Sequence, residues 1–268
     1  MSAACIAIPV VPPYEPARGK PYAPARADVF SYSSIAEGHD ALADLSVESD
    51  VDDATVVSHV VADADAATNL GTAFHRLAQL AVLNWQPGCA LERPDAARQR
   101  VLEKSCSLTD AQRERLDAAL GRWFASDVAA RVAACADVRA EVPFFAQLGT
   151  AARPAYLEGE IDVLAEVSAP GTAESPVGEA LVVDYKTGGS PAETPEQLHE
   201  KHLLQTTCYA YAALLQGYAQ VECVFVRVEQ ARTDAPTAPQ TVRYRFEAAD
   251  APAMRQAIVQ AYEESKQR

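Results

Sequence analysis

The sequence predicts an α/β protein with a central mixed β-sheet of about five strands, flanked by helices and preceded by an N-terminal helical portion. Between residues 72 and 134, apolar residues recur at the three- and four-residue spacing of amphipathic helices. From residue 138 the pattern changes to short apolar runs separated by turn residues, which is typical of strands. A helix, two more strands and a last helix follow, and this alternation predicts the α/β class.

Composition and charge narrow the class of protein. The 268 residues are 49% hydrophobic and 22% charged, which is ordinary for a domain with a full core. The formal net charge of -14 argues against a protein that grips nucleic acid by bulk electrostatics alone. It does not argue against a catalytic site built from carboxylates. Affinity for a nucleic acid would then require a local basic patch, a bound metal or another domain.

The six cysteines lie at positions 5, 89, 106, 135, 208 and 223, with no C-x-x-C pair. This spacing excludes the usual zinc and iron–sulfur motifs and offers no disulfide framework, so we expect reduced thiols in a cytoplasmic protein. The apolar residues 6–11 are interrupted by Pro9 and follow no basic segment, which is unlike a signal peptide. No stretch is long enough to span a membrane, so no membrane association is expected.

The N-terminal region is expected to be extended, and the domain is expected to span residues 29–268. Residues 1–28 contain six prolines and are a proline-rich linker by composition. Residues 30–35 are expected to open the domain with a helix capped by a serine. Residues 37–65 carry nine acidic side chains, which indicates a solvated surface or a mobile loop rather than a metal site.

Two helical regions follow. The first, residues 72–84, has a core stripe with His75 beside it, and Thr68 or Asn69 is a candidate cap. The second, residues 95–134, is expected to form one or two helices broken near residues 105–107, with Thr109 or Ser107 as a cap. Its aromatic residues, Trp123 and Phe124, are expected in the core rather than on a base-stacking surface.

Three strands are expected at residues 138–145, 155–167 and 179–185, the last two forming a hairpin across a loop at 168–178. By alternation, Ile161 and Val163 should share one face, and Glu160 and Asp162 the other. Asp162 would then lie beside Asp184 if the register allows it.

A long helix is expected at residues 195–216, with Pro195 in its first turn and Gly217 at its C-terminal cap. Gln205 and Tyr209 are four residues apart and share a face. His199 and His202 lack the spacing of a zinc helix and are expected to be solvated or to contact a partner. Strands at 221–228 and 241–246 and a helix at 248–266 complete the chain.

Residues 181–188 combine a short apolar run with an acid and a lysine. Asp184 and Lys186 point to one face of the expected strand, where they form either an ion pair at a strand end or part of a site. Together with His75 and Asp162, they form a set of one imidazole, two carboxylates and a lysine. Such ligands suit Mg²⁺ or Mn²⁺, and a lysine beside the metal is the equipment for metal-assisted phosphodiester hydrolysis.

The order and spacing of these residues resemble the PD-(D/E)xK nuclease superfamily, which has a restriction-endonuclease-like core. More narrowly, they resemble the C-terminal nuclease domain of RecB/AddA-type helicase–nucleases (exodeoxyribonuclease V beta subunit-like). The residues that carry the resemblance are 30–34, 71–75 (GTAFH), 141–144 (EVPF), 159–162 (GEID), 184–188 (DYKTG), and Gln205 with Tyr209.

The resemblance implies a role for each matching residue. Mg²⁺, with Mn²⁺ as a substitute, would be bound by His75, Asp162, Asp184 and the backbone carbonyl of Tyr185. Lys186 would orient or activate the attacking water, and Gln205 and Tyr209 would position the lysine and the DNA strand. Glu141 is either a structural carboxylate or part of the site, and Glu160 either supports the site or is merely adjacent to it.

Two departures refine the resemblance. The chain lacks the cysteines that hold an iron–sulfur cluster in the AddB branch, so no such cluster is expected and the RecB/AddA branch is favoured. It also lacks a Walker A motif, so it is either the nuclease domain of a larger helicase–nuclease subunit or a stand-alone relative. The proline-rich start resembles a tether and favours the first. The implied partners are single-stranded DNA, the helicase domain of the same parent chain and a second AddB/RecC-like subunit.

Three hypotheses about function follow. The first is a metal-dependent exonuclease that degrades DNA unwound by a helicase during double-strand-break repair and recombination. The second is a catalytically silent nuclease-fold module that guides DNA or docks a partner subunit. All expected polar positions are occupied, which favours the first over the second. The third is a binding protein with ordinary surface ion pairs, which predicts that His75, Asp162 and Asp184 lie apart in space.

Overall fold

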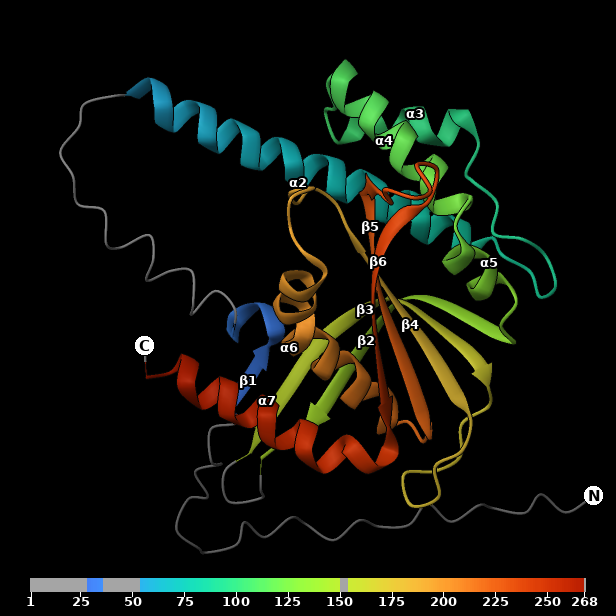
Figure 1. Ribbon diagram of the computed structural model, residues 1–268, viewed down its shortest axis with the longest axis vertical. Coiled ribbons are helices and arrows are strands. Elements are labelled where there is room, and N and C mark those ends of the chain that lie inside the picture. The colour runs from blue at the N-terminus through green and yellow to red at the C-terminus, as the bar shows by residue number, and fades with distance from the viewer. Residues whose placement is uncertain (1–27, 36–53, 150–153, 268) are drawn as a thin grey trace, which may run out of the picture.

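The computed structural model describes residues 28–35, 54–149 and 154–267, and a single mixed sheet forms their centre (Figure 1). The sheet has six strands in the order β1-β3-β4-β5-β6, with β2 also paired to β3. These strands are β1 (Asp28–Ser31), β2 (Asp137–Gln147), β3 (Ala155–Ser168), β4 (Glu179–Lys186), β5 (Gln220–Ala231) and β6 (Pro239–Glu247). The predicted mixed α/β sheet is confirmed. The strand that sequence analysis missed is β1, which is only four residues long.

Helices cover both faces of the sheet. They are α2 (Ala54–Leu83), α3 (Ala96–Ser105), α4 (Asp110–Phe124), α5 (Asp127–Ala133), α6 (Pro195–Leu214) and α7 (Ala251–Ser265), with a short 3-10 turn η1 (Ala248–Asp250) before α7. In Figure 1, α2 to α5 gather on one side of the sheet, and α6 and α7 lie on the other. Each side has its own apolar core, because alternate residues of a strand point to opposite faces.

The predicted hairpin of the second and third strands is confirmed, and the structure adds a parallel pairing that was not predicted. Strands β3 and β4 form an antiparallel hairpin, and β5 lies parallel to β4 after the crossover through α6. A parallel neighbour requires such a crossover, and the apolar face of α6 covers the sheet it crosses. Pro195 lies in the first turn of α6 and Thr194 caps it, as the sequence predicted for the proline. The carboxyl end of β4 therefore lies close to the start of α6.

The helices on the α2 side differ from the predictions in extent. Helix α2 begins at Ala54 instead of near residue 72, so Thr68 and Asn69 lie inside the helix and do not cap it. The second region forms three helices rather than one or two. The predicted break after Ser105 is confirmed, and so is the cap at Thr109, whose side chain accepts a hydrogen bond from the Gln112 amide. Trp123 is fully buried, as predicted.

At the N-terminal side, Ser31 accepts a hydrogen bond from the amide of Ser34, which confirms a serine cap before the helical residues 32–35. The predicted linker up to residue 27 lies outside the described residues, as does most of the acidic segment. Residues 54–65 of that segment are helical rather than a loop.

The predicted alternation around Asp162 is wrong. Ile161 packs in the core on the α6 side, whereas Val163 packs in the core on the α2 side. Across from Asp162 on β2, Glu141 has a left-handed backbone with φ of 50°, and the β2–β3 ladder resumes on either side of it. This irregularity reverses the side-chain alternation, which a period-two pattern in the sequence cannot reveal.

His202 is also placed differently from its prediction. It is buried, with only 6% of its surface exposed, and its ring stacks on Phe225 with 4.7 Å between centroids. His199 is exposed, and its ring lies beside that of Tyr244. The stacking explains why a polar residue near the start of α6 belongs to the core.

The buried His202 should make the stability of the fold depend on pH. Burial, together with the charge of Lys186, lowers the pKa of His202 to about 4, whereas an unfolded histidine has a pKa near 6.5. The unfolded chain therefore binds an extra proton between these values. The free energy of unfolding should be fully retained above about pH 6.5 and fall by up to about 3 kcal/mol as pH drops towards 4.

Urea unfolding of the wild type and His202→Phe across this pH range measures the effect, because phenylalanine keeps the stacked ring but cannot titrate. The wild type should lose stability relative to the variant as pH falls. A difference between the two that does not change with pH would contradict the expectation.

Candidate active site

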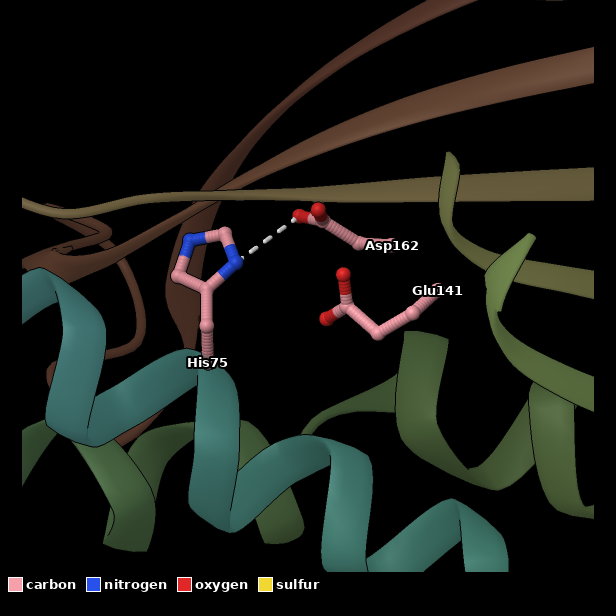
Figure 2. Close-up of side chains that lie close together, drawn as sticks. All are labelled: His75, Glu141 and Asp162. Carbon is pink, nitrogen blue, oxygen red and sulfur yellow. Dashed lines mark ion pairs between the residues drawn. The ribbon is translucent and has the colours of Figure 1, made fainter. Parts of the chain in front are cut away.

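Three side chains from three elements converge near the middle of the sheet (Figure 2). His75 comes from α2, Glu141 from β2 and Asp162 from β3, and one ligand atom of each lies within 4.8 Å of the others. His75 Nδ1 is 3.4 Å from Asp162 Oδ2. One imidazole nitrogen and two carboxylate oxygens suit a hard divalent cation, so this cluster fits the metal that the sequence analysis expected.

Asp162 is fixed by the backbone of the next strand. The β3–β4 ladder ends at the pair Val163 and Val183, and beyond it Asp162 Oδ2 accepts a hydrogen bond of 2.8 Å from the Tyr185 amide. The side chain thus replaces the ladder where the strands separate. This anchoring presents the carboxylate at the opening between β3 and β4, towards α2.

Glu141 occupies a strained and crowded position. A left-handed backbone in a residue other than glycine costs about 1–3 kcal/mol, and such strain clusters at functional sites. Burial raises the pKa of Glu141 to about 8, aided by its hydrogen bond to Glu160 and the charge of Asp162. The pKa of His75 is also raised: burial lowers it, but the hydrogen bond and charge of Asp162 outweigh that effect. A bound cation would relieve this crowding of negative charge.

The carboxyl end of β4 supplies a second group of residues. Asp184 is 3% exposed; its Oδ1 accepts a hydrogen bond of 3.0 Å from Gln205 Nε2, and its Oδ2 lies 2.8 Å from Lys186 Nζ. Gln205 Nε2 also donates to Tyr209 Oη at 2.8 Å. Burial raises the pKa of Asp184 to about 6, against the charge of Lys186. In this arrangement Gln205 holds the aspartate, and Tyr209 holds Gln205.

The structure therefore brings the sequence-predicted residues into one region in two groups. His75 and Asp162 lie together with Glu141, which the sequence analysis had left open, whereas Asp184 faces α6 and pairs with Lys186. Asp184 remains within electrostatic reach of both His75 and Asp162. The hypothesis of unrelated surface pairs required these residues to lie apart, and the 3.4 Å contact does not support it. The metal-binding roles of Asp184 and of the Tyr185 carbonyl stay predictions.

A groove with a volume of about 710 Å³ gives access to the first group. It opens between α2 and the turn after β4, which approach each other closely at Gly71. A Cβ atom on Gly71 would lie 2.9 Å from Thr187 Oγ1, so a larger residue would force the two elements to adjust. The lining residues are Gly71, Thr72, His75, Arg76, Gln79, Glu141, Glu160 and Thr187.

The sequence alone does not decide whether Glu141 is a structural carboxylate or part of the site, whereas the structure places it beside His75 and Asp162. Its position opposite Asp162 depends on the antiparallel β2–β3 register, and its direction depends on a single left-handed backbone angle. The acid-Pro-Phe motif was the one available signal. Gln205 is expected from sequence to position Lys186, but it donates a hydrogen bond to Asp184, the partner of the lysine. Helical spacing shows only that Gln205 and Tyr209 share a face.

An imidazole, several carboxylates and a lysine gathered where β3 and β4 separate are the groups of a metal-dependent hydrolytic type of site. Residues 53–268 match the PD-(D/E)XK nuclease superfamily, and the chain belongs to this superfamily. No curated protein sequence matches the chain. Among solved structures, the crystal structure of SSO0001 is 14% identical, covering 63% of this chain and 70% of that chain with a TM-score of 0.32. No helix in the described ranges is long and apolar enough to cross a membrane.

The metal-binding role of the cluster formed by His75, Glu141 and Asp162 can be tested by substitution. We expect Glu141→Gln and Asp162→Asn each to weaken Mn²⁺ binding, measured by calorimetry, at least about tenfold, because each removes a charged oxygen ligand. Glu158→Gln is the matched control, since Glu158 is an exposed acid on the same strand β3 as Asp162. If Asp184→Asn weakens binding and Glu141→Gln does not, Glu141 is structural and the ligands predicted from sequence are the right ones.

Metal binding should also depend on pH. Without metal the pKa of Glu141 is about 8, so below that value a cation must displace its proton. Mn²⁺ affinity should therefore rise as pH increases towards 8, and Glu141→Gln should flatten the upper part of this rise. A wild-type affinity that is constant between pH 6.5 and 8.5 would contradict the assignment.

Proposed function

We propose that this protein is a metal-dependent DNA nuclease that hydrolyses phosphodiester bonds with Mg²⁺. The observation that carries the proposal is the convergence of His75, Glu141 and Asp162 within 4.8 Å, beside the Asp184–Lys186 pair of the adjoining strand. A cluster of acids with one histidine could serve structure alone. The pair of the half-buried Lys186 with the buried Asp184 beside it adds the positive charge that phosphodiester cleavage requires.

The residues divide the chemistry between them. His75, Glu141 and Asp162 would hold the cation, with Asp184 as a further carboxylate on the opposite side of the opening. A bound Mg²⁺ supplies Lewis-acid activation of the phosphate and lowers the pKa of a water. Lys186 Nζ lies between Asp184 and the ring of Phe225, 5.3 Å from the ring centroid, where it can orient the water and stabilise charge on the phosphate. Gln205 keeps Asp184 in place.

The more specific proposal is a RecB/AddA-type nuclease. It rests on the order of the motifs from residues 71–75 to Tyr209 and on their fit to the elements described above. Under this proposal the protein degrades single strands exonucleolytically as a helicase unwinds them, in double-strand-break repair and recombination. Residues 1–28 would link the domain to the helicase part of a larger subunit, next to a second AddB/RecC-like subunit. Delivery of DNA by that helicase would offset the net charge of -14.

Two substitutions test the nuclease activity. With Mg²⁺ and linear single-stranded DNA, Lys186→Ala and Asp184→Ala should each reduce the cleavage rate at least about a hundredfold. The first removes the positive charge that stabilises the phosphate, and the second removes the carboxylate that pairs with the lysine and faces the cation. Lys201→Ala is the control, since Lys201 pairs with Glu193 on the surface. Comparing linear with circular single strands separates exonuclease from endonuclease action.

Unchanged cleavage in both variants would contradict the proposed site. A wild type that binds DNA without cleaving it, at any Mg²⁺ or Mn²⁺ concentration, would instead support the silent nuclease-fold module.

A further inference from the structure

A second groove, with a volume of about 550 Å³, lies on the far side of the turn that follows Lys186. One wall is helix α4, and the other is formed by Gly188, Gly189 and the end of β5. Thr187, the preceding residue, lines the groove over the metal cluster. The turn at residues 187–189 thus contributes lining residues to both grooves. A DNA strand leaving the metal cluster across this turn would enter the second groove.

Helix α4 presents one specific face to this groove. Its lining residues are Ala111, Glu114, Arg115, Ala118 and Arg122, which follow the spacing of a single helical face. The two alanines have small side chains that leave space in the groove. The two arginines are seven residues apart, which is about 10 Å along the helix axis. The opposite face carries Leu116, Leu120 and Trp123 and is fully buried. Packing therefore fixes which way the two arginines point.

Both arginines are held in place by the end of β5. Arg115 Nε donates to Glu229 Oε1 at 2.8 Å, and Glu229 Oε2 accepts a bond of 2.6 Å from the Gly188 amide. Arg122 Nη1 donates to the carbonyl of Val228 at 3.0 Å. Each guanidinium is anchored through one nitrogen and keeps further donors for a ligand. Arginine held in this way loses little rotamer entropy when it binds a phosphate.

The charge of the groove differs from that of the whole chain. Glu229 is 9% exposed and uses both oxygens on Arg115 and Gly188, so the acid that faces the groove openly is Glu114. Two arginines and two glutamates thus line the groove, and one of each, Arg115 and Glu229, form an ion pair. Arg113 on the same helix does not line the groove and pairs instead with Asp110 and Glu103. The formal charge of the lining is therefore zero, against -14 for the chain. The positive charge that remains for a phosphate is that of Arg122, which is anchored on the Val228 carbonyl rather than on a carboxylate.

We propose that this groove binds the phosphodiester backbone of the DNA strand on one side of the cleaved bond, with Arg115 and Arg122 each contacting a phosphate. The inference rests on the proposed nuclease function and assigns a path for its substrate. The Gly188–Gly189 backbone forms the opposite wall, so the strand would pass between α4 and the turn. Because the contacts are to phosphates, they carry no sequence preference.

Binding is measured by fluorescence anisotropy of a labelled single-stranded oligothymidylate with Mg²⁺, in the Lys186→Ala background to prevent cleavage. Arg115→Ala and Arg122→Ala should each weaken binding. In the double variant, the slope of log affinity against log salt should decrease in magnitude by about 1.4, at about 0.7 per lost phosphate contact. Arg113→Ala is the matched control on the same helix and should leave the slope unchanged. Thermal unfolding of each variant confirms that it is folded.

Equal slopes for the double variant and Arg113→Ala would overturn the inference. Cleavage assays on proteins that retain Lys186 distinguish failure of the groove assignment from failure of the proposed nuclease function. If the wild type does not cleave DNA but the arginine variants lose affinity, the nuclease assignment fails and the binding groove stands. If the wild type cleaves and the arginine variants cleave long strands as the control does, only the groove assignment fails.

Discussion

The hydrogen bond from the Tyr185 amide to Asp162 is the interaction on which the site depends. It begins where the β3–β4 ladder ends, so a side chain takes over the role of the backbone at the point where the strands separate. Had the ladder continued, the carboxylates of the two strands would lie on a closed sheet surface. The opening instead lets α2 bring His75 against Asp162 from one side, while α6 braces Asp184 from the other.

Two costs are concentrated at this opening. Glu141 adopts a left-handed backbone, and Asp184 is buried with its charge offset by Lys186 and Gln205. Burying an ionised group is unfavourable unless it is paired and hydrogen-bonded, and a strained backbone persists only where its surroundings determine it. A fold selected for stability alone would remove both features by simple substitutions. Their occurrence together, within one opening of the sheet, is what links the structure to metal-dependent chemistry.

Much of the fold could be predicted from sequence because its elements are long and strongly periodic. The hairpin of β3 and β4 and the helix after β4 follow from apolar patterns and turn residues. The irregularity at Glu141, where Ile161 and Val163 come to lie on opposite faces, could not be predicted. Pro143 and Gly159 lie nearby on the two strands, but neither indicates that Glu141 itself has a left-handed backbone. The burial of His202 could not be predicted for a related reason. It depends on a stacking contact with Phe225, which is remote in sequence. Glu141 joins the candidate metal ligands through that same unmarked irregularity.

The turn after Lys186 connects the chemistry to the rest of the molecule. Its residues contact α2 at Gly71, β5 through Glu229 and, through Arg115, helix α4. Arg227, buried beside Lys186 in the β4–β5 pairing, extends the brace by donating to the carbonyl of Ser190 and to Glu193. A short glycine-containing turn would otherwise move freely, and the lysine at its start would move with it. The same contacts that fix the turn also orient the arginines of α4, so the position of the lysine and the shape of the neighbouring groove are set by one network. In a chain with a net charge of -14, this network fixes the positions of three cationic side chains, Lys186, Arg115 and Arg122, around one turn.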